Sequence, residues 1–173
     1  PVREILALLD GADIPERVRQ RARAVFTRLA EVEAAIHGVE VGDVELHEVG
    51  ALDSIVDVVG VCAALEALDI DEVWCSPIAV GHGSIRSAHG VIPNPAPATA
   101  ALLADAAAPT VGIDTSLEVC TPTGVALMTT LSCGFGAMPS MTPTSVGYGA
   151  GTADTPERAN VVQAVVGAAH SDQ

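Results

Sequence analysis

An α/β fold is predicted for this chain, as a single compact domain in which a small mixed sheet packs against helices. Three observations support the prediction. Apolar residues recur at helical spacing along residues 15–37, short β-like runs alternate with helical segments further along the chain, and 49% of the 173 residues are hydrophobic. We place the domain at residues 1–168, followed by a disordered tail at 169–173, and we expect functional loops rich in glycine, proline and histidine.

The best-marked element is an amphipathic helix over residues 15–37. Its apolar residues are separated by spacings of four and three, which places them in one stripe: Val18, Ala22, Val25, Leu29, Val32 and Ile36. Pro15 suits the first turn, and Gly38 suits the stop just past the helix end. The opposite, arginine-rich face is expected to be solvated, with Arg28 placed to pair with Glu31.

Shorter or less regular patterns predict four further helices. Their approximate bounds are residues 3–9, 53–68, 98–106 and 125–131. Asp53 is expected to cap the second of these, which is apolar on most sides and is therefore predicted to be central.

Four short runs are predicted as strands. They are residues 72–76, 78–80, 119–121 and 159–169. Glycine, serine, histidine and proline dominate residues 81–99, and this stretch is predicted to be a loop with turns. Glycines return in SVGYGAGT, residues 145–152, which we interpret as glycine-rich turns.

Charge is distributed unevenly along the chain. Residues 1–28 hold six arginines against four acidic residues, whereas the remainder holds two arginines against eighteen acidic residues, and the net charge is −14. The chain has no lysine, which excludes a lysine Schiff base and a Walker-type phosphate loop. The scarcity of clustered cations argues against a nucleic acid polymer as partner, and an acidic surface favours cations.

Three features predict a cytoplasmic protein without a membrane partner. No apolar run reaches the roughly 20 residues that cross a bilayer, and the first residues lack the basic region of a signal peptide. The four cysteines contain no CxxC pair, and we interpret them as reduced thiols, with Cys62 as a small core residue.

Four candidate metal or proton ligands lie in the stretch VELHEVGALDSIVDVVG, residues 44–60. Asp53 and Asp57 are four apart on the expected helix and share a face, while His47 and Glu48 come from the loop before it. Such a group could bind a divalent cation, or pair a general base with an orienting carboxylate. The alternative is structural: Asp53 is an ordinary N-cap, Asp57 pairs with an arginine, and His47 packs at the rim.

The stretch GHGSIRSAHG, residues 81–90, is the second candidate. His82 and His89 are seven apart, with Arg86 between them, and the flanking glycines allow a ligand to approach the backbone. The planar guanidinium of Arg86 suits a phosphate or a carboxylate. The alternative is a flexible surface loop without a ligand.

The third candidate combines CTPTG, residues 120–124, with SVGYGAGT. Hydroxyl groups and the exposed amides of glycine-rich turns can bind an anion, particularly where TPTG opens a helix. Tyr148 is the sole tyrosine, and a glycine on either side leaves it exposed to a partner. The alternative is that both segments are only turns.

Four motifs resemble, in order and spacing, the nickel-insertion proteins of the nickel-pincer-nucleotide cofactor pathway, the LarC family: HEVGALDSIVDVVG, CSPIAVGHGSIRSAHGVIPNPAPAT, CTPTGVAL and VGYGAGTADTPERANVV. The resemblance runs from Pro15 to about Val166, and the combination of motifs is specific. It corresponds to the central region of the family, and the family's N-terminal segment and C-terminal CTP-linked domain are expected to lie outside it.

The resemblance implies a cyclometallase-like lyase that inserts nickel into pyridinium-3,5-bisthiocarboxylic acid mononucleotide and forms a metal–carbon bond. It also implies that CTP is consumed with Mg²⁺ or Mn²⁺, and that the product serves lactate racemase and related enzymes. We further expect a homo-oligomer. The alternative is a non-catalytic carrier of nickel or nucleotide that works with separate subunits.

Roles for individual residues follow from the same resemblance. The expected catalytic residues are His47, Glu48 and His89. The expected nickel ligands are His47, Glu48, Asp53, Asp57, His82 and His89. The nucleotide is expected to contact Arg86, Ser87, Thr121, Thr123, Gly124, Tyr148 and Gly149. Breaking the pyridinium C–H bond needs a base, for which His47 and His89 are the candidates.

Overall fold

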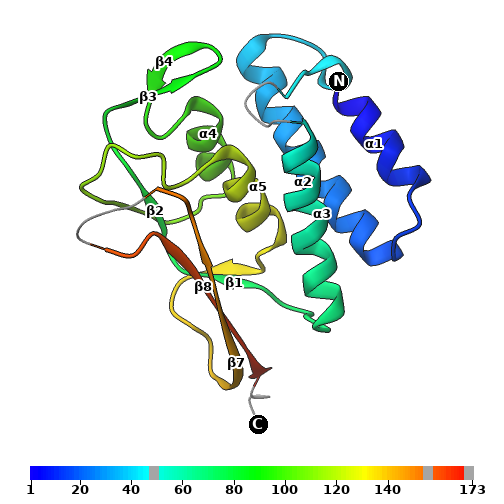
Figure 1. Ribbon diagram of the computed structural model, residues 1–173, viewed down its shortest axis with the longest axis vertical. Coiled ribbons are helices and arrows are strands. Elements are labelled where there is room, and N and C mark those ends of the chain that lie inside the picture. The colour runs from blue at the N-terminus through cyan, green and yellow to red at the C-terminus, as the bar shows by residue number, and fades with distance from the viewer. Residues whose placement is uncertain (47–50, 154–157, 170–173) are drawn as a thin grey trace.

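The computed structural model describes residues 1–46, 51–153 and 158–169, and it confirms the α/β class. The elements in chain order are α1 (Val2–Gly11), α2 (Glu16–His37), the 3-10 turn η1 (Val41–Asp43), α3 (Ala51–Ala67), β1 (Trp74–Cys75), β2 (Ile78–Val80), β3 (Ser84–Ser87), β4 (Gly90–Pro93), α4 (Pro97–Asp105), β5 (Thr110–Gly112), α5 (Pro122–Leu131), β6 (Gly134–Phe135), β7 (Met141–Ala150) and β8 (Val161–Ala169). Helices α1, α2 and α3 lie on one side, α4 and α5 lie in the middle, and the strands lie on the other side (Figure 1).

Helix α2 forms the centre of the core because it contacts α1, α3, α4 and α5. The predicted stripe is buried as far as Val32, and Phe26 and Ala30 widen it. Ile36, in the last turn of the helix, is exposed. Gly38 ends the helix in the left-handed conformation, φ 66°, which glycine adopts at little cost. The helix is therefore confirmed, and it begins one residue later than predicted, because Pro15 is the N-cap.

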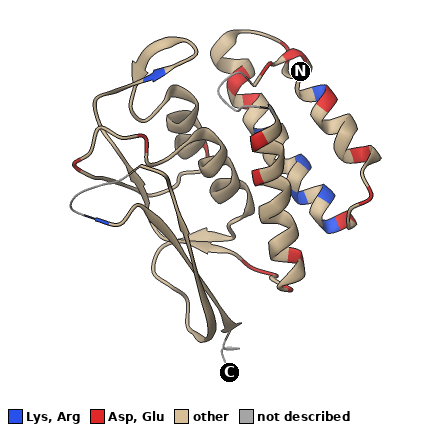
Figure 2. Ribbon diagram, in the orientation of Figure 1, with Lys and Arg blue, Asp and Glu red and all other residues tan. Residues whose placement is uncertain are grey.

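The arginines of α2 are not simply solvated, because two of them form hydrogen bonds to the turn after α3. Arg17 donates to the Ile70 carbonyl at 2.9 Å and to Asp71 at 2.8 Å, and Arg21 donates to the same carbonyl at 2.8 Å. These bonds fasten the turn after α3 to α2. The predicted pair of Arg28 with Glu31 is present at 3.0 Å. Most of the basic residues lie on α2, whereas acidic residues are spread over α1, α2, α3 and the turn after α3 (Figure 2).

The strands form four separate pairs rather than one mixed sheet. β1 pairs with β6 and β2 with β5, both in parallel, while β3–β4 and β7–β8 are antiparallel hairpins. Ile78–Val80 therefore pairs independently of the strand before it, as the proline between them allows. Only Trp74 and Cys75 of the run predicted at 72–76 are in a strand.

Two predicted loops and one predicted strand are wrong. Residues 81–99 contain the hairpin β3–β4, in which Arg86 pairs with Val91 across the ladder. SVGYGAGT lies largely in the long strand β7, which pairs with β8. The hydrogen bonds of this ladder join backbone groups, so the glycines do not prevent the strand from forming. Residues 119–121 are not a strand, because Thr121 instead caps α5 by accepting a bond from the Gly124 amide at 3.3 Å.

Helix α3 lies at the surface and is not central as predicted. Val58 and Cys62 face the core, as expected for Cys62, but Leu52 is 73% exposed and Val56 is 62% exposed. The helix begins at Ala51, so Asp53 lies inside its first turn and is not the N-cap. None of the described helices is long and apolar enough to cross a bilayer.

Candidate functional site

A hollow of about 430 Å³ lies between α3 and the start of α5. Residues of two predicted motifs line it, although they are far apart in the sequence: Asp57 from α3, and Thr121, Thr123 and Gly124 from TPTG. Val56, Gly60, Val61 and Leu127 complete the lining. The fold therefore brings one expected nickel ligand together with three expected nucleotide contacts.

The chemistry of this hollow is divided between its two walls. The α3 wall carries the Asp57 carboxylate among apolar side chains. The α5 wall carries two threonine hydroxyls at a helix N-terminus, where the backbone dipoles favour negative charge. One wall thus suits a cation and the other an anion.

The segment that leads into TPTG is held by residues that the sequence analysis did not single out. Asn94 is buried, and its side-chain amide donates to the carbonyls of His82 at 3.3 Å, Ser116 at 3.2 Å and Leu117 at 2.9 Å. Thr99, at the start of α4, is fully buried and donates to the Cys120 carbonyl at 3.4 Å. Both residues belong to the motif PNPAPAT, and this motif was the sequence signal that could have identified them.

Close backbone packing accompanies these bonds at Gly81. A Cβ atom on Gly81 would lie 2.5 Å from the Leu117 carbonyl oxygen and 2.6 Å from Asn94 Nδ2. Only glycine fits there, since Cβ atoms do not approach other heavy atoms so closely. Gly81 therefore sets how closely the β3–β4 hairpin meets the segment before TPTG.

The two histidines of GHGSIRSAHG lie at opposite ends of the β3–β4 hairpin. His82 is at the open end, with Nε2 3.0 Å from Asp114 Oδ1, whereas His89 is in the turn, where its amide donates to Ser87 Oγ at 3.1 Å. A strand advances about 3.3 Å per residue, so β3 separates the two by roughly 10 Å or more. Arg86 is exposed on β3.

His89 lies beside a histidine that the sequence analysis missed. Its ring centroid is 5.1 Å from that of His37, the last residue of α2, and the rings are tilted by 42°. Glu33, one turn earlier on α2, has Oε2 3.4 Å from His37 Nε2. No sequence signal marked His37, because it ends a helix far from every motif.

None of the other expected site residues that the structure describes lines the hollow. His47 and Glu48 lie outside the described residues, so their expected roles stay predictions. Tyr148 is 68% exposed on β7, where its hydroxyl accepts a bond from Gln163 at 2.8 Å, and Gly149 follows it. Among the described residues, no three histidine, cysteine, aspartate or glutamate side chains form a group that could hold a metal ion by themselves.

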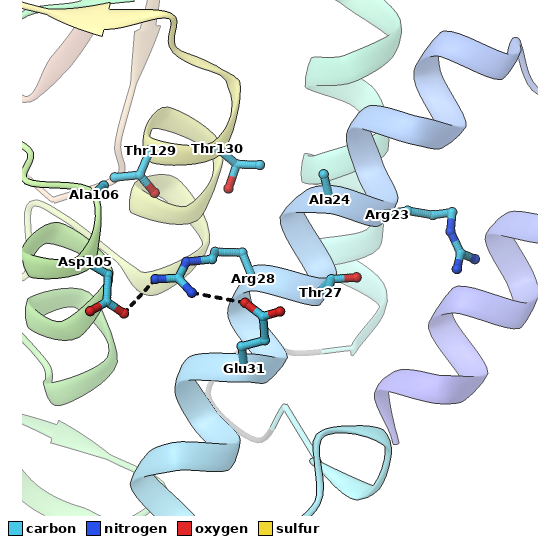
Figure 3. Close-up of a pocket in the computed structure, with 9 residues that line it drawn as sticks. All are labelled: Arg23, Ala24, Thr27, Arg28, Glu31, Asp105, Ala106, Thr129 and Thr130. Atoms are coloured by element: carbon cyan, nitrogen blue, oxygen red, sulfur yellow. Dashed lines mark hydrogen bonds and ion pairs between the residues drawn. The ribbon is translucent and has the colours of Figure 1, made fainter.

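A second hollow, of about 460 Å³, lies among α2, α4 and α5 (Figure 3). Arg28 reaches from α2 to Asp105 at the end of α4, at 2.6 Å, while also contacting Glu31. Arg23 points away toward α1, where it pairs with Asp10 at 2.6 Å. The charges around this hollow are mutually paired, and they fasten α4 to α2.

Cys120, immediately before TPTG, is buried among apolar side chains. Burial raises the pKa of the Cys120 thiol to about 12, and the Glu118 carboxylate and the Cys75 thiol act in the same direction. Burial also raises the pKa of Cys75, and it raises that of Cys62 against the opposing effect of Arg21. These thiols stay protonated at neutral pH, and all four cysteines are free.

The folded protein is expected to lose stability as pH rises above 9.0, the ordinary thiol pKa, toward about 12. Over that range the Cys120 thiol ionises only in the unfolded chain, so the folded state binds more protons and stability falls. The loss from Cys120 is at most about 1.4 kcal/mol per pH unit. Urea unfolding at about pH 8 and about pH 10 tests this, and Cys120→Ala should flatten the slope. An equal slope in Cys120→Ala and in a variant of exposed Cys133 would contradict it.

A family model described as "Nickel insertion protein" matches residues 1–173. The chain belongs to the nickel insertion protein family. This confirms the resemblance seen in the motifs, and it gives the hollow between α3 and α5 a chemical context.

Individual relatives agree with the family match. A protein of Geobacter metallireducens is 49% identical over 166 residues, which are 96% of this chain and 42% of that protein. Relatives named "Pyridinium-3,5-bisthiocarboxylic acid mononucleotide nickel insertion protein" occur in Geobacillus kaustophilus, 44% identical over 95% of this chain and 39% of that protein, and in Staphylococcus saprophyticus, 43% identical over 94% and 41%. This chain thus spans about two fifths of the length of these relatives. No solved structure matches it.

Proposed function

We propose that this chain forms the part of a nickel-insertion enzyme that binds pyridinium-3,5-bisthiocarboxylic acid mononucleotide, the compound in the names of its relatives. The observation that carries the proposal is the hollow between α3 and α5, which joins Asp57 to TPTG. This mononucleotide carries a positive charge on the ring nitrogen, two thiocarboxylate groups on ring carbons and a phosphate on its ribose. The two walls of the hollow offer a matching carboxylate and helix N-terminus.

Each lining residue has a proposed role in holding this nucleotide. In this proposal the apolar side chains of α3 and Leu127 contact the faces of the ring, and Asp57 faces the positively charged ring nitrogen. Thr121, Thr123 and Gly124 receive the phosphate. Arg86 and Ser87 on β3 are proposed as further contacts to the anionic groups, and Tyr148 and Gly149 on β7 as more distant ones.

Insertion of nickel replaces a proton on the ring carbon between the two thiocarboxylate groups. The electron pair of the C–H bond becomes the bond to Ni²⁺, the proton passes to a base, and no redox change occurs. His47, with Glu48, is the proposed base, and His89 is the alternative. Asp53, in the first turn of α3, is proposed to attract the cation. The lyase classification, CTP with Mg²⁺ or Mn²⁺, maturation of lactate racemase, a homo-oligomer and a cytoplasmic location belong to the same proposal.

Asp57→Asn is expected to weaken binding of the pyridinium mononucleotide by about tenfold, which corresponds to about 1.4 kcal/mol. The amide keeps the size of the carboxylate but loses its attraction to the positively charged ring nitrogen. Isothermal titration calorimetry with the nickel-free nucleotide measures the effect.

Asp69→Asn is the matched control, because Asp69 lies past the end of α3 at φ 54°, which asparagine also tolerates. It removes the same charge away from the hollow and should leave the affinity unchanged. Equal affinity in the wild type and Asp57→Asn would refute the nucleotide site.

A separate experiment distinguishes the enzyme from the alternative, a non-catalytic carrier. This chain is mixed with the remaining domains of a relative, and product that forms only in the mixture favours the carrier.

A further inference from the structure

The contact between His37 and His89 joins two segments that are distant in the sequence. His37 ends the long core helix α2, and His89 occupies the turn of the β3–β4 hairpin. The end of α2 and the turn of the β3–β4 hairpin lie close together at one end of the molecule (Figure 1). Both histidines are exposed, so a solute can reach their rings.

The Glu33 carboxylate favours one tautomer of the His37 ring. Its side chain is only 9% exposed, and burial of a carboxylate is costly without a compensating contact. The carboxylate oxygen 3.4 Å from His37 Nε2 favours a proton on that nitrogen. The lone pair is then on Nδ1, the nitrogen that remains for a metal ion. Carboxylates orient metal-binding histidines in this way in many proteins.

We propose that His37 and His89 together bind a divalent transition metal ion, and that Glu33 positions His37 for it. Metal–nitrogen bonds of about 2.0–2.1 Å on a shared ion place two imidazole centroids roughly 4.5–5 Å apart. The observed centroid distance of 5.1 Å is close to this range. Imidazole nitrogen is a donor that nickel prefers.

If the proposed function holds, the ion is the nickel that the protein delivers. A site with two protein ligands leaves the other positions of the ion open to water. The thiocarboxylate sulfur atoms of the substrate can replace that water without first displacing a full protein shell. The incomplete ligand set therefore suits an ion that must be handed on, whereas three or four protein ligands suit an ion that stays.

The competing explanation is that these contacts only stabilise the fold. A protonated His37 at the C-terminus of α2 would interact favourably with Glu33 and with the helix dipole, and His89 would merely pack on it. That explanation predicts an effect on unfolding and none on nickel. The two explanations therefore differ in a measurable way.

The test titrates NiCl₂ into the wild type and into His37→Ala, His89→Ala and the double variant by calorimetry. Each single variant should weaken nickel binding about tenfold or more, and the double variant should lose little beyond that, because both residues serve one ion. Thermal unfolding confirms that each variant is folded. Paramagnetic Ni²⁺ should broaden the ring NMR signals of His37 and His89 before those of His82.

Two further variants complete the design. Glu33→Gln should weaken nickel binding and shift the ¹⁵N resonances of the His37 ring toward the other tautomer, which a purely structural role would not do. His82→Ala removes a histidine at the other end of the hairpin. Loss of nickel binding in His82→Ala, or unchanged binding in His37→Ala, overturns the inference. In the second case, a nucleotide affinity that still depends on Asp57 leaves the proposed function standing.

Discussion

Replacement of Phe26 by alanine is expected to lower the free energy of unfolding by about 3–5 kcal/mol. Phe26 is fully buried on α2, and among the described residues it is the largest side chain buried to this degree. Its neighbours in the core are mainly valine, alanine and leucine, and small aliphatic side chains on packed helices cannot move far enough to fill the space. Since a typical domain has a stability of about 5–15 kcal/mol, this single change removes a large part of it.

Phe135→Ala is the matched control, because the chain has two phenylalanines and Phe135 is only partly buried, on β6. Urea unfolding followed by circular dichroism should give a clearly smaller loss for Phe135→Ala. Equal losses would mean that the core does not centre on α2. A loss below about 1 kcal/mol for Phe26→Ala would mean that the cavity collapses, contrary to the packing described above.

The helices could be predicted because their signals are local. The stripe from Val18 to Val32 and the stop at Gly38 define α2 without reference to other segments. Phe26 and Ala30 fell outside the predicted stripe, since their burial depends on α2 having neighbours on several sides. The surface position of α3 was missed for a similar reason. An apolar helix face such as that of Val56 does not reveal whether another element covers it.

The strands were harder because their pairing is not local. Residues such as Gly147 and Gly149 read as turn residues, yet they lie opposite Ala164 and Val162 in the β7–β8 ladder. Backbone hydrogen bonds along the ladder stabilise this strand, although the glycines have no side chains to contribute. The same reason explains the missed β3–β4 hairpin.

The candidate site was predicted in pieces. Asp57 and TPTG were identified from local motifs, but only the fold shows that they line one hollow. His37 could not be identified, because its significance depends entirely on the distant turn that brings His89 beside it. Asn94 and Thr99 were quoted within a motif without a role, since the carbonyls that they bind lie about twenty residues further along.

Asn94→Asp is expected to destabilise the protein by about 3 kcal/mol or more at neutral pH. The two protons of the Asn94 side-chain amide are shared among three carbonyl oxygens, at 2.9–3.3 Å. An aspartate there turns a negative charge toward the same oxygens in a buried position. The charge must remain without a partner or take a proton, so its pKa in the folded state should rise.

The sign of the pH dependence follows from that rise. A carboxyl group whose pKa is raised on folding destabilises the protein above its unfolded pKa of about 3.9, and the penalty disappears below it. Urea unfolding at about pH 7 and about pH 4.5 should therefore show a smaller loss at the lower pH. Asn160→Asp is the control, because Asn160 is only half-buried and, among the described residues, its side-chain amide donates to the Ala153 carbonyl at 3.1 Å.

Binding should change together with stability in the folded fraction of Asn94→Asp. Asn94 joins the open end of the β3–β4 hairpin to Ser116 and Leu117, which lead into TPTG. Its loss should therefore weaken both nickel binding at the hairpin turn and nucleotide binding in the hollow between α3 and α5. Asp57→Asn is expected to affect the nucleotide and His37→Ala the metal, each with little effect on the other. If Asn94→Asp weakens both, Asn94 is the connection that positions the hairpin turn relative to the hollow between α3 and α5. Unchanged affinities would show that the turn and the hollow are positioned independently.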